Sequence, residues 1–184
     1  GLKKAYAKGT ELRGKTLGVI GFGRIGQETA KIALGVGMKV IFHDPSTQNA
    51  TITVPFFDGQ SLSFELTTTS KEELLKEADF VTLHVPAQKE YVMGKAEFES
   101  MKDGAAIVNA ARGGVVDEVA LIAALDSGKL SFAGLDVFEN EPTPAVQVLM
   151  NPKVSLTPHI GAATGGAQDR IGTELAEQII SILK

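Results

Sequence analysis

Three polar residues in the second half of the sequence combine the side chains needed to move a proton beside a bound carboxylate. They are Arg112, Glu141 and His159, and each follows a short apolar run. An arginine can hold a carboxylate and a neighbouring carbonyl through two hydrogen bonds. A histidine titrates near neutral pH, and a nearby carboxylate favours its charged form. Each residue alone could equally be an ordinary surface charge, so the hypothesis requires all three to lie together.

A second group of residues has the spacing of a phosphate-binding turn. The motif GFGRIG (residues 21–26) begins where an apolar run ends and leads directly into a helical pattern. Gly21 permits a tight turn, Gly23 lets the backbone approach a pyrophosphate, and Gly26 lets the helix pack closely on the sheet. The helix N-terminus offers free amides to the anion. Without the flanking strand and helix, the motif would as readily be a plain turn.

Asp44 ends the next apolar run, 23 residues after Gly21. A carboxylate at this place can accept hydrogen bonds from both hydroxyls of an adenosine ribose and would repel a 2′-phosphate. Because residues 45–50 contain no Lys or Arg, we expect NAD rather than NADP. The alternative is that Asp44 only begins an Asp-Pro turn. His84 could line the cofactor pocket or be a satisfied buried histidine, and Pro86 would stiffen the loop beside it.

Short strands and helices must alternate to place these side chains at one edge of a sheet. Six apolar runs have the length of buried parallel strands: 16–20, 38–43, 79–85, 104–109, 131–137 and 153–157. Helical patterns separate them, at 24–36, 70–78, 95–100, 118–126 and from Thr164 onward. This alternation predicts an α/β fold, a doubly wound parallel sheet between helices in three layers. We expect strand order 3-2-1-4-5-6, with the cofactor crossing between strands one and four.

Residues 51–67 interrupt this alternation. Apolar residues alternate with others over 52–56 and again over 62–66, and Asp58-Gly59 lies between the two runs. Asp-Gly between two runs of period two is a strong hairpin signal. We therefore expect an extra antiparallel β-hairpin at this point.

Local signals also define two of the helices. Ser70 and Glu73 match a capping box at the start of a short helix. The final helix carries its apolar residues on one face, which we expect to be buried: Ile171, Leu175, Ile179 and Leu183.

The composition of the sequence limits the kinds of partner and cofactor that we expect. The 184 residues carry a net charge of -4, which gives no reason to expect nucleic acid or a membrane surface as a partner. No apolar run is long enough to span a membrane. The sequence has no cysteine, so thiolate metal sites are excluded, and we expect no metal. A reducing compartment is compatible with this composition, and the cytoplasm is the expected location.

Five ordered runs in this sequence resemble the D-isomer-specific 2-hydroxyacid dehydrogenases, and most closely the branch that acts on 3-phosphoglycerate. The runs are GKTLGVIGFGRIGQ (14–27), TLHVP (82–86), NAARGGVVDE (109–118), AGLDVFENEP (133–142) and TPHIGAAT (157–164). The resemblance implies a Rossmann fold and an NAD(H)-dependent exchange of a hydride with a small 2-hydroxy or 2-keto acid.

The resemblance also implies a role for each site residue. Arg112 would hold the substrate's carboxylate and carbonyl, and His159, paired with Glu141, would be the general acid and base. Asp136 would help hold the nicotinamide carboxamide, and Asp44 the adenosine ribose. The residues expected to contact NAD are Gly21, Gly23, Arg24, Ile25, Gly26, Asp44, His84, Pro86, Ala110, Arg112, Asp136, His159 and Gly161.

Members of this family carry a second, smaller domain that closes over the substrate, and this chain lacks its segments. We therefore expect residues 1–184 to form one dinucleotide-binding domain, with 1–13 as a linker or helix remnant, and weak or no turnover by this chain alone. The resemblance also implies a homodimer. An alternative function is an NAD-sensing interaction module of the kind found among transcriptional corepressors, because such proteins can keep the same residues.

Overall fold

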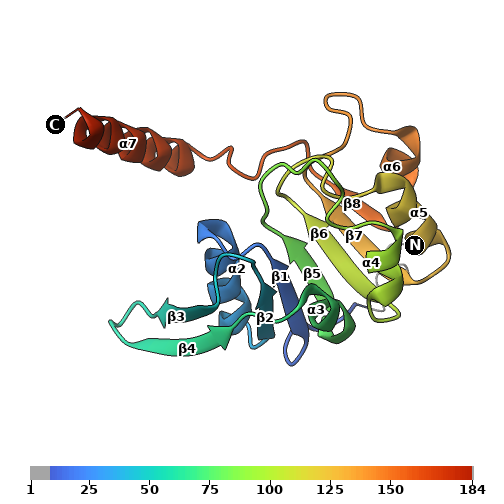
Figure 1. The fold of residues 1–184 in the computed structure, drawn as a ribbon, viewed down its shortest axis with the longest axis horizontal. Coiled ribbons are helices and arrows are strands. Elements are labelled where there is room, and N and C mark those ends of the chain that lie inside the picture. The colour runs from blue at the N-terminus through green and yellow to red at the C-terminus, as the bar shows by residue number, and fades with distance from the viewer. Residues whose placement is uncertain (1–8, 184) are drawn as a thin grey trace.

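Six short apolar runs form one parallel sheet in the computed structural model, which describes residues 9–183 (Figure 1). The strands are β1 (Thr16–Ile20), β2 (Lys39–His43), β5 (Phe80–Leu83), β6 (Ala105–Asn109), β7 (Leu130–Leu135) and β8 (Val154–Leu156). Every expected strand is present, and its ends differ from the prediction by no more than two residues. Residues 1–8 of the linker or helix remnant expected at 1–13 lie outside the described residues.

Helices cover both faces of this sheet. They are α2 (Arg24–Gly35), α3 (Lys71–Glu77), α4 (Lys95–Ser100), α5 (Glu118–Asp126) and α6 (Val146–Met150). A last helix, α7 (Gly165–Ile182), projects away from the sheet (Figure 1). Neighbouring residues of β1 face opposite sides: Val19 packs in the core beneath α2, and Ile20 packs in the core beneath α3, α4 and α5. Helix α6 was not predicted from the sequence, because it has five residues and no side-chain cap. The α/β architecture expected from the sequence is confirmed.

The observed strand order is β2-β1-β5-β6-β7-β8, so the predicted order 3-2-1-4-5-6 is wrong. The prediction put strand 79–85 outside β2, but this strand, β5, pairs with β1 on its other side, with Leu17 opposite Phe80. Helix α3 explains the difference, because it crosses directly over β1: a Cβ on Gly18 would lie 2.6 Å from Leu74 Cδ2. The chain thus changes direction between β1 and β5, and the crevice expected between strands one and four moves there.

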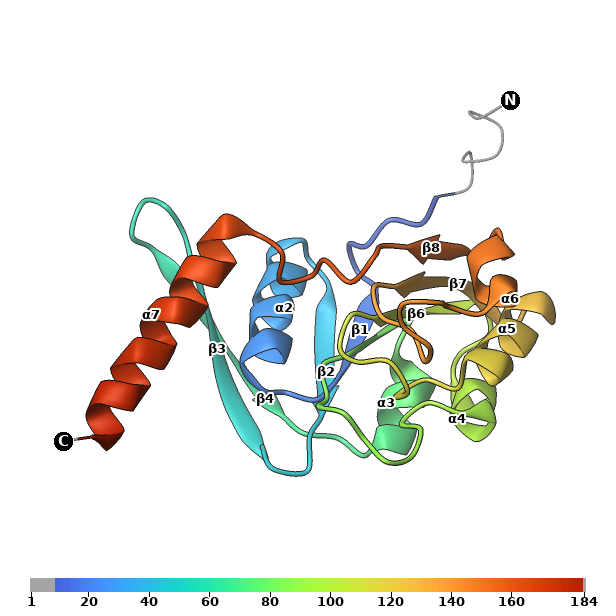
Figure 2. The same ribbon diagram turned by 90° about the horizontal axis from the view of Figure 1, so that it is seen from above.

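The expected hairpin is present as a separate two-stranded antiparallel sheet. Its strands are β3 (Asn49–Pro55) and β4 (Ser61–Thr67), and Gly59 takes a positive φ of 86° in the connecting turn. Ile52 on its inner face is buried in the core beneath α2. The tip projects beyond that contact, and Phe57 there is fully exposed. Figure 2 shows the hairpin extending past the edge of the main sheet.

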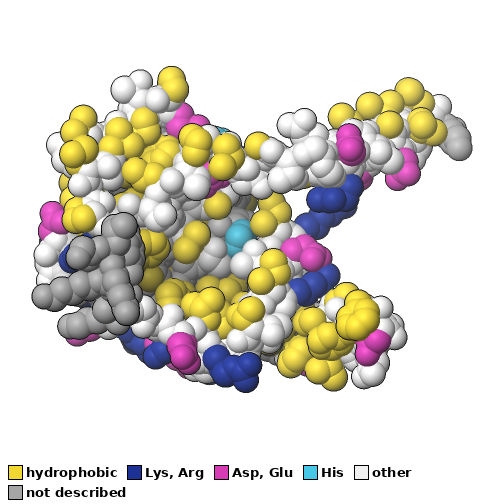
Figure 3. Space-filling model, turned by 180° about the vertical axis from the view of Figure 1, so that it is seen from behind, with side chains coloured by type: hydrophobic (Ala, Val, Ile, Leu, Met, Phe, Trp, Pro, Cys, Tyr) yellow, Lys and Arg dark blue, Asp and Glu magenta, His cyan; other side chains and the backbone are white. Residues whose placement is uncertain are grey.

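Helix α7 does not bury the apolar face predicted for it. None of its residues is buried, and Ile171, Leu175 and Ile179 are each about half exposed. Figures 1 and 2 show α7 leaving the end of the sheet and projecting on the same side of the molecule as the hairpin, from which it lies apart in Figure 1. In Figure 3 both projections, α7 and the hairpin, present apolar side chains to solvent. The sequence pattern identified an apolar face correctly, but no other described element packs against it.

Candidate active site

The loops that follow β1, β2 and β5 surround a cavity of about 400 Å³ at the carboxyl ends of these strands. Such a crevice beside a change of strand direction is where open α/β sheets bind ligands. Five residues of the predicted cofactor set line it: Gly21, Gly23, Asp44, His84 and Pro86. Ser46 and Lys71 also line it and were missed, because no local pattern marks them. Lys71 Nζ lies 2.9 Å from Glu97 Oε1, so its charge is paired.

The glycine turn has a shape suited to a pyrophosphate. Gly21 has a positive φ of 89°, and a Cβ there would lie 2.6 Å from the carbonyl oxygen of His84. A Cβ on Gly26 would overlap the carbonyl oxygen of Gly21, so α2 approaches the strand as closely as glycine allows. In contrast, a Cβ on Gly23 would meet no protein atom within 4 Å. The space over Gly23, at the free amides of α2, is therefore open to an anionic group.

Asp44 fastens the glycine turn to the end of β2. Its carboxylate accepts hydrogen bonds from the amides of Phe22 at 2.7 Å, Ser46 at 2.8 Å and Thr47 at 3.1 Å. Its oxygens thus lie at the cavity in a fixed orientation. The neighbouring His84 is half-buried, its Nε2 lies 3.1 Å from Thr82 Oγ1, and burial lowers its pKa.

The side chains of Arg24, Ile25 and Ala110, also in the predicted cofactor set, are exposed. The guanidinium of Arg24 forms an ion pair with Glu174, which lies on α7. This contact between the glycine turn and the last helix was not expected from the sequence, since 150 residues separate the two side chains.

Glu141 and His159 come together beside the ends of β7 and β8. His159 Nδ1 donates a hydrogen bond to Glu141 Oε2 at 2.8 Å, as expected for residues that follow neighbouring strands. The amide of Phe138 also donates to the Glu141 carboxylate, at 3.0 Å. The hydrogen bond from His159, followed by that from Phe138, holds the pKa of Glu141 below its ordinary value. His159 remains 51% exposed, so its other ring nitrogen is accessible to a substrate.

The backbone of His159 is unusual. Among residues 9–183, His159 is the one non-glycine residue with a positive φ, which is 55°. Such a conformation costs free energy and persists where surrounding contacts impose it.

The carboxylate of Asp136 supplies contacts that hold the His159 loop. It accepts hydrogen bonds from the Thr157 hydroxyl at 2.5 Å and from the amides of Ile160 and Gly161 at 2.9 Å each. Burial works against ionisation of Asp136, but these hydrogen bonds outweigh it, and its pKa lies below the ordinary value. Asp136 was expected beside the nicotinamide, but nothing in the sequence indicated that its hydrogen-bond donors flank His159.

Arg112 lies in the loop after β6, with an exposed side chain whose Nη1 donates to the carbonyl of Ala111 at 2.6 Å. Asn109, which is buried and was missed, shapes this loop: its amide group donates to the carbonyl of Arg112 and accepts from the amide of Ala111, each at 3.1 Å. A Cβ on Gly113 would overlap the carbonyl oxygen of Phe138. The Arg112 loop therefore packs directly against the loop that leads to Glu141.

The family model described as "D-isomer specific 2-hydroxyacid dehydrogenase, NAD binding domain" matches residues 2–161. The chain belongs to this family. It is 46% identical over 186 residues to hydroxypyruvate reductase of Thermotoga maritima, covering 98% of this chain and 57% of the relative. It is 46% identical over 179 residues to D-3-phosphoglycerate dehydrogenase of Methanocaldococcus jannaschii, covering 96% and 33%.

A solved structure agrees with this membership. Glyoxylate reductase from Paecilomyes thermophila superposes with a TM-score of 0.81 at 37% identity, and the match covers 96% of this chain and 51% of that one. The chain thus spans about half the length of the relatives it matches, or less. Because the chain belongs to this NAD-binding family, its cofactor is NAD.

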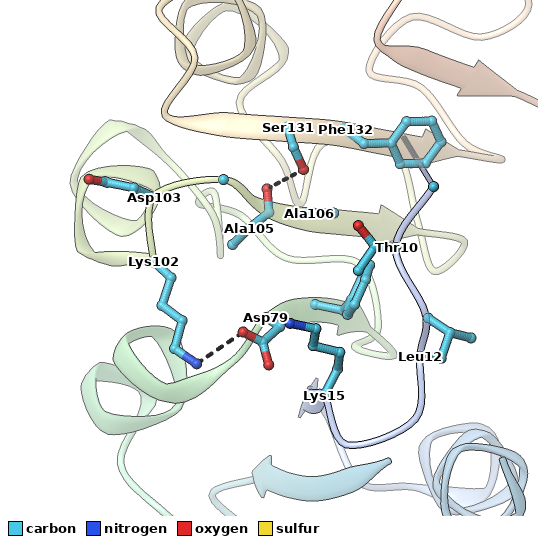
Figure 4. A pocket seen from close by; sticks show the side chains of 13 residues that line it. Thr10, Leu12, Lys15, Asp79, Lys102, Asp103, Ala105, Ala106, Ser131 and Phe132 are labelled. Atoms are coloured by element: carbon cyan, nitrogen blue, oxygen red, sulfur yellow. Dashed lines mark hydrogen bonds and ion pairs between the residues drawn. The ribbon is translucent and has the colours of Figure 1, made fainter. Parts of the chain in front are cut away.

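A second cavity, of about 550 Å³, lies at the opposite edge of the sheet, near the amino ends of β5, β6 and β7 (Figure 4). Two of its charged lining residues form an ion pair, in which Lys102 Nζ lies 3.1 Å from Asp79 Oδ1. None of the predicted site residues lines it. Over residues 9–183, no group of three or more metal-ligating side chains could hold a metal ion. In the same range, no helix is long and apolar enough to cross a membrane.

Proposed function

We propose that this dehydrogenase domain, within its complete gene product, catalyses reversible hydride exchange between NAD(H) and a D-2-hydroxy acid. The observation that carries the proposal is the 2.8 Å contact between Glu141 and His159 at the sheet edge that also bears the glycine turn. A dinucleotide that enters over Gly23 would extend along this edge toward His159.

Each residue of the trio has a distinct role in the proposed reaction. The exposed guanidinium of Arg112 binds the carboxylate and carbonyl of a 2-keto acid. The bound cofactor supplies or accepts the hydride at the carbonyl carbon. His159 gives a proton to the carbonyl oxygen during reduction and takes it back during oxidation. Because Nδ1 of His159 faces Glu141, its Nε2 is the atom that transfers this proton.

The remaining predicted residues serve the cofactor. Gly21, Gly23 and Gly26, with Arg24 and Ile25, form the pyrophosphate site at the start of α2. Asp44 binds the adenosine ribose, and the 400 Å³ cavity around it supports this assignment. The nicotinamide half lies against four further residues: Ala110, Arg112, Asp136 and His159. Gly161 completes the set, and His84 and Pro86 border the adenosine half.

For the substrate, we propose 3-phosphoglycerate, with a place in serine biosynthesis. The relative from Methanocaldococcus jannaschii, named D-3-phosphoglycerate dehydrogenase, supports this choice. The relative named hydroxypyruvate reductase supports a smaller substrate equally well by identity. Assays of 3-phosphohydroxypyruvate, hydroxypyruvate and glyoxylate would distinguish them by kcat/KM, and a preference for hydroxypyruvate would overturn the choice.

The proposal includes three features beyond the chemistry: a second region of chain that closes over the substrate, a homodimer and a cytoplasmic location. The half-length match to relatives supports the first. The sequence resemblance to the family supports the second, and the absence of cysteine is compatible with the third. Light scattering of the complete gene product and cell fractionation test the last two.

The central experiment combines binding and turnover. This chain should bind NADH, and the complete gene product should oxidise NADH with a 2-keto acid. His159→Asn is the sharpest variant, because asparagine tolerates a positive φ and can donate to Glu141, yet cannot transfer the proton. We expect kcat to fall by about 100-fold or more, while NADH still binds through its pyrophosphate and adenosine contacts. Wild-type kcat in His159→Asn would refute the proposed role.

A further inference from the structure

Two glutamates hold each other's backbone beside the proposed active site. Glu118 is the first residue of α5, and Glu139 lies in the loop after β7. The amide of Glu118 donates to Glu139 Oε1 at 2.9 Å, and the amide of Glu139 donates to Glu118 Oε1 at 2.8 Å. The two bonds form a reciprocal clasp between segments 21 residues apart. No motif in the sequence predicted it.

Placing two carboxylates next to each other is unfavourable unless hydrogen bonds from the backbone amides offset the cost. Glu118 is only 6% exposed, and burial raises its pKa, with a further rise from the charge of Glu139. Two like charges repel, so the attraction that joins the two segments comes from the hydrogen bond that each carboxylate accepts from the other residue's amide. The amide of Glu118 is also one of the donors in the first turn of α5 that have no partner within the helix, and the Asp117 side chain accepts from another of them, the amide of Ala120.

The clasp joins the segment that follows Arg112 to the loop that carries Glu141. Arg112 lies upstream of Glu118 in one loop, and Glu141 lies two residues beyond Glu139 in the other. Phe138, directly before Glu139, donates its amide to the Glu141 carboxylate at 3.0 Å. A shift of Glu139 would therefore move the donor that orients Glu141.

We propose that Glu118 and Glu139 are positioning residues whose clasp sets the separation between the Arg112 loop and the Glu141–His159 pair. The inference rests on the proposed function, because it assigns the pair a role in that reaction. Neither glutamate is a catalytic residue, since each is engaged with backbone amides rather than with the exposed side of His159.

The first test measures the geometry in this chain and needs no activity. Amide hydrogen exchange, followed by NMR, measures how strongly the amides of Glu139 and Phe138 are protected by their hydrogen bonds. Glu118→Ala removes the acceptor, and we expect both amides to exchange about tenfold faster or more. Glu118→Gln keeps an oxygen acceptor and should restore exchange to within about threefold of wild type. Glu99→Ala, which removes an exposed glutamate on α4, is the matched control and should change neither amide.

The second test measures the consequence in the complete gene product. We expect Glu118→Ala to lower kcat by about tenfold with NADH Kd within about twofold, and Glu118→Gln to recover most of the loss. Unchanged exchange at Phe138 in Glu118→Ala, or wild-type kcat despite faster exchange, would overturn the proposal. If wild type and His159→Asn were equally inactive, the proposed function would fail, whereas the exchange data would still decide whether the clasp orders the loop.

Discussion

Replacing Gly23 with alanine separates the contribution of the glycine turn to folding from its contribution to cofactor binding. Gly23 has a φ of -70°, which any residue adopts. A Cβ there would meet no protein atom within 4 Å. Alanine therefore introduces no clash, and it lowers the conformational entropy of the unfolded chain. We expect the free energy of unfolding to be unchanged or higher by about 0.4–1 kcal/mol.

The same methyl group should weaken cofactor binding. It projects into the open space through which a pyrophosphate would reach the free amides of α2. Once a pyrophosphate occupies this space, an added methyl group costs about 1–3 kcal/mol of binding free energy. The Kd for NADH should therefore rise by about five- to 150-fold.

Fluorescence titration with NADH and thermal unfolding of the same samples would measure both effects. Gly26→Ala is the contrasting variant, because its Cβ would overlap the Gly21 carbonyl and should lower stability as well as binding. Gly35→Ala, also in open space but at the far end of α2, should raise the free energy of unfolding by about 0.4–1 kcal/mol and leave NADH binding unchanged. If folded Gly23→Ala bound NADH like wild type, the pyrophosphate would not pass over Gly23, and the placement of the cofactor would be wrong.

Three further predictions test other parts of the site. Asp44→Ala removes the acceptor of three amides and should lower the free energy of unfolding by about 1–3 kcal/mol. The same variant should bind NADH less selectively over NADPH, and an unchanged ratio of the two Kd values in calorimetric titration would contradict this. The pKa values of Asp136 and Glu141 are lowered by folding, so their stabilisation is present above their unfolded pKa values near about 4 and is lost as the pH falls through the folded values. Urea unfolding between about pH 6 and about pH 3 should show the loss, and Asp136→Asn should reduce it. Gly113→Ala should displace the Phe138 loop, lowering stability by about 1–3 kcal/mol, and an unshifted Phe138 amide resonance would refute the contact.

Elements whose signals are local were predicted with accurate ends. The capping box at Ser70 and Glu73 is present: the Ser70 side chain accepts from the Glu73 amide, and the Glu73 carboxylate accepts from Ser70. The Asp58-Gly59 turn forms as expected, because its conformation depends on the residues within it. These interactions involve residues a few positions apart, so the sequence contains both partners in one window.

The candidate site was predictable to the extent that it follows from neighbouring strands. The contact between Glu141 and His159 was expected because the strands before them, β7 and β8, are consecutive and paired. The clasp of Glu118 and Glu139 was not, because a carboxylate that accepts a loop amide has no sequence signal. The clasp forms because the two backbone segments lie close enough for each carboxylate to reach the other amide, and short sequence patterns do not determine that separation.

The amino-acid sequence by itself determined the strands, the helices and the residue types at the carboxyl edge of the sheet, since hydrophobic period and turn residues act over short distances. Tertiary structure decided that β5 pairs with β1 rather than lying outside β2, because the choice depends on where α3 packs. It likewise decided that Ile171 and its neighbours on α7 stay exposed. An apolar stripe shows that a helix has a face to bury, but only the assembled fold determines whether a surface is there to cover it.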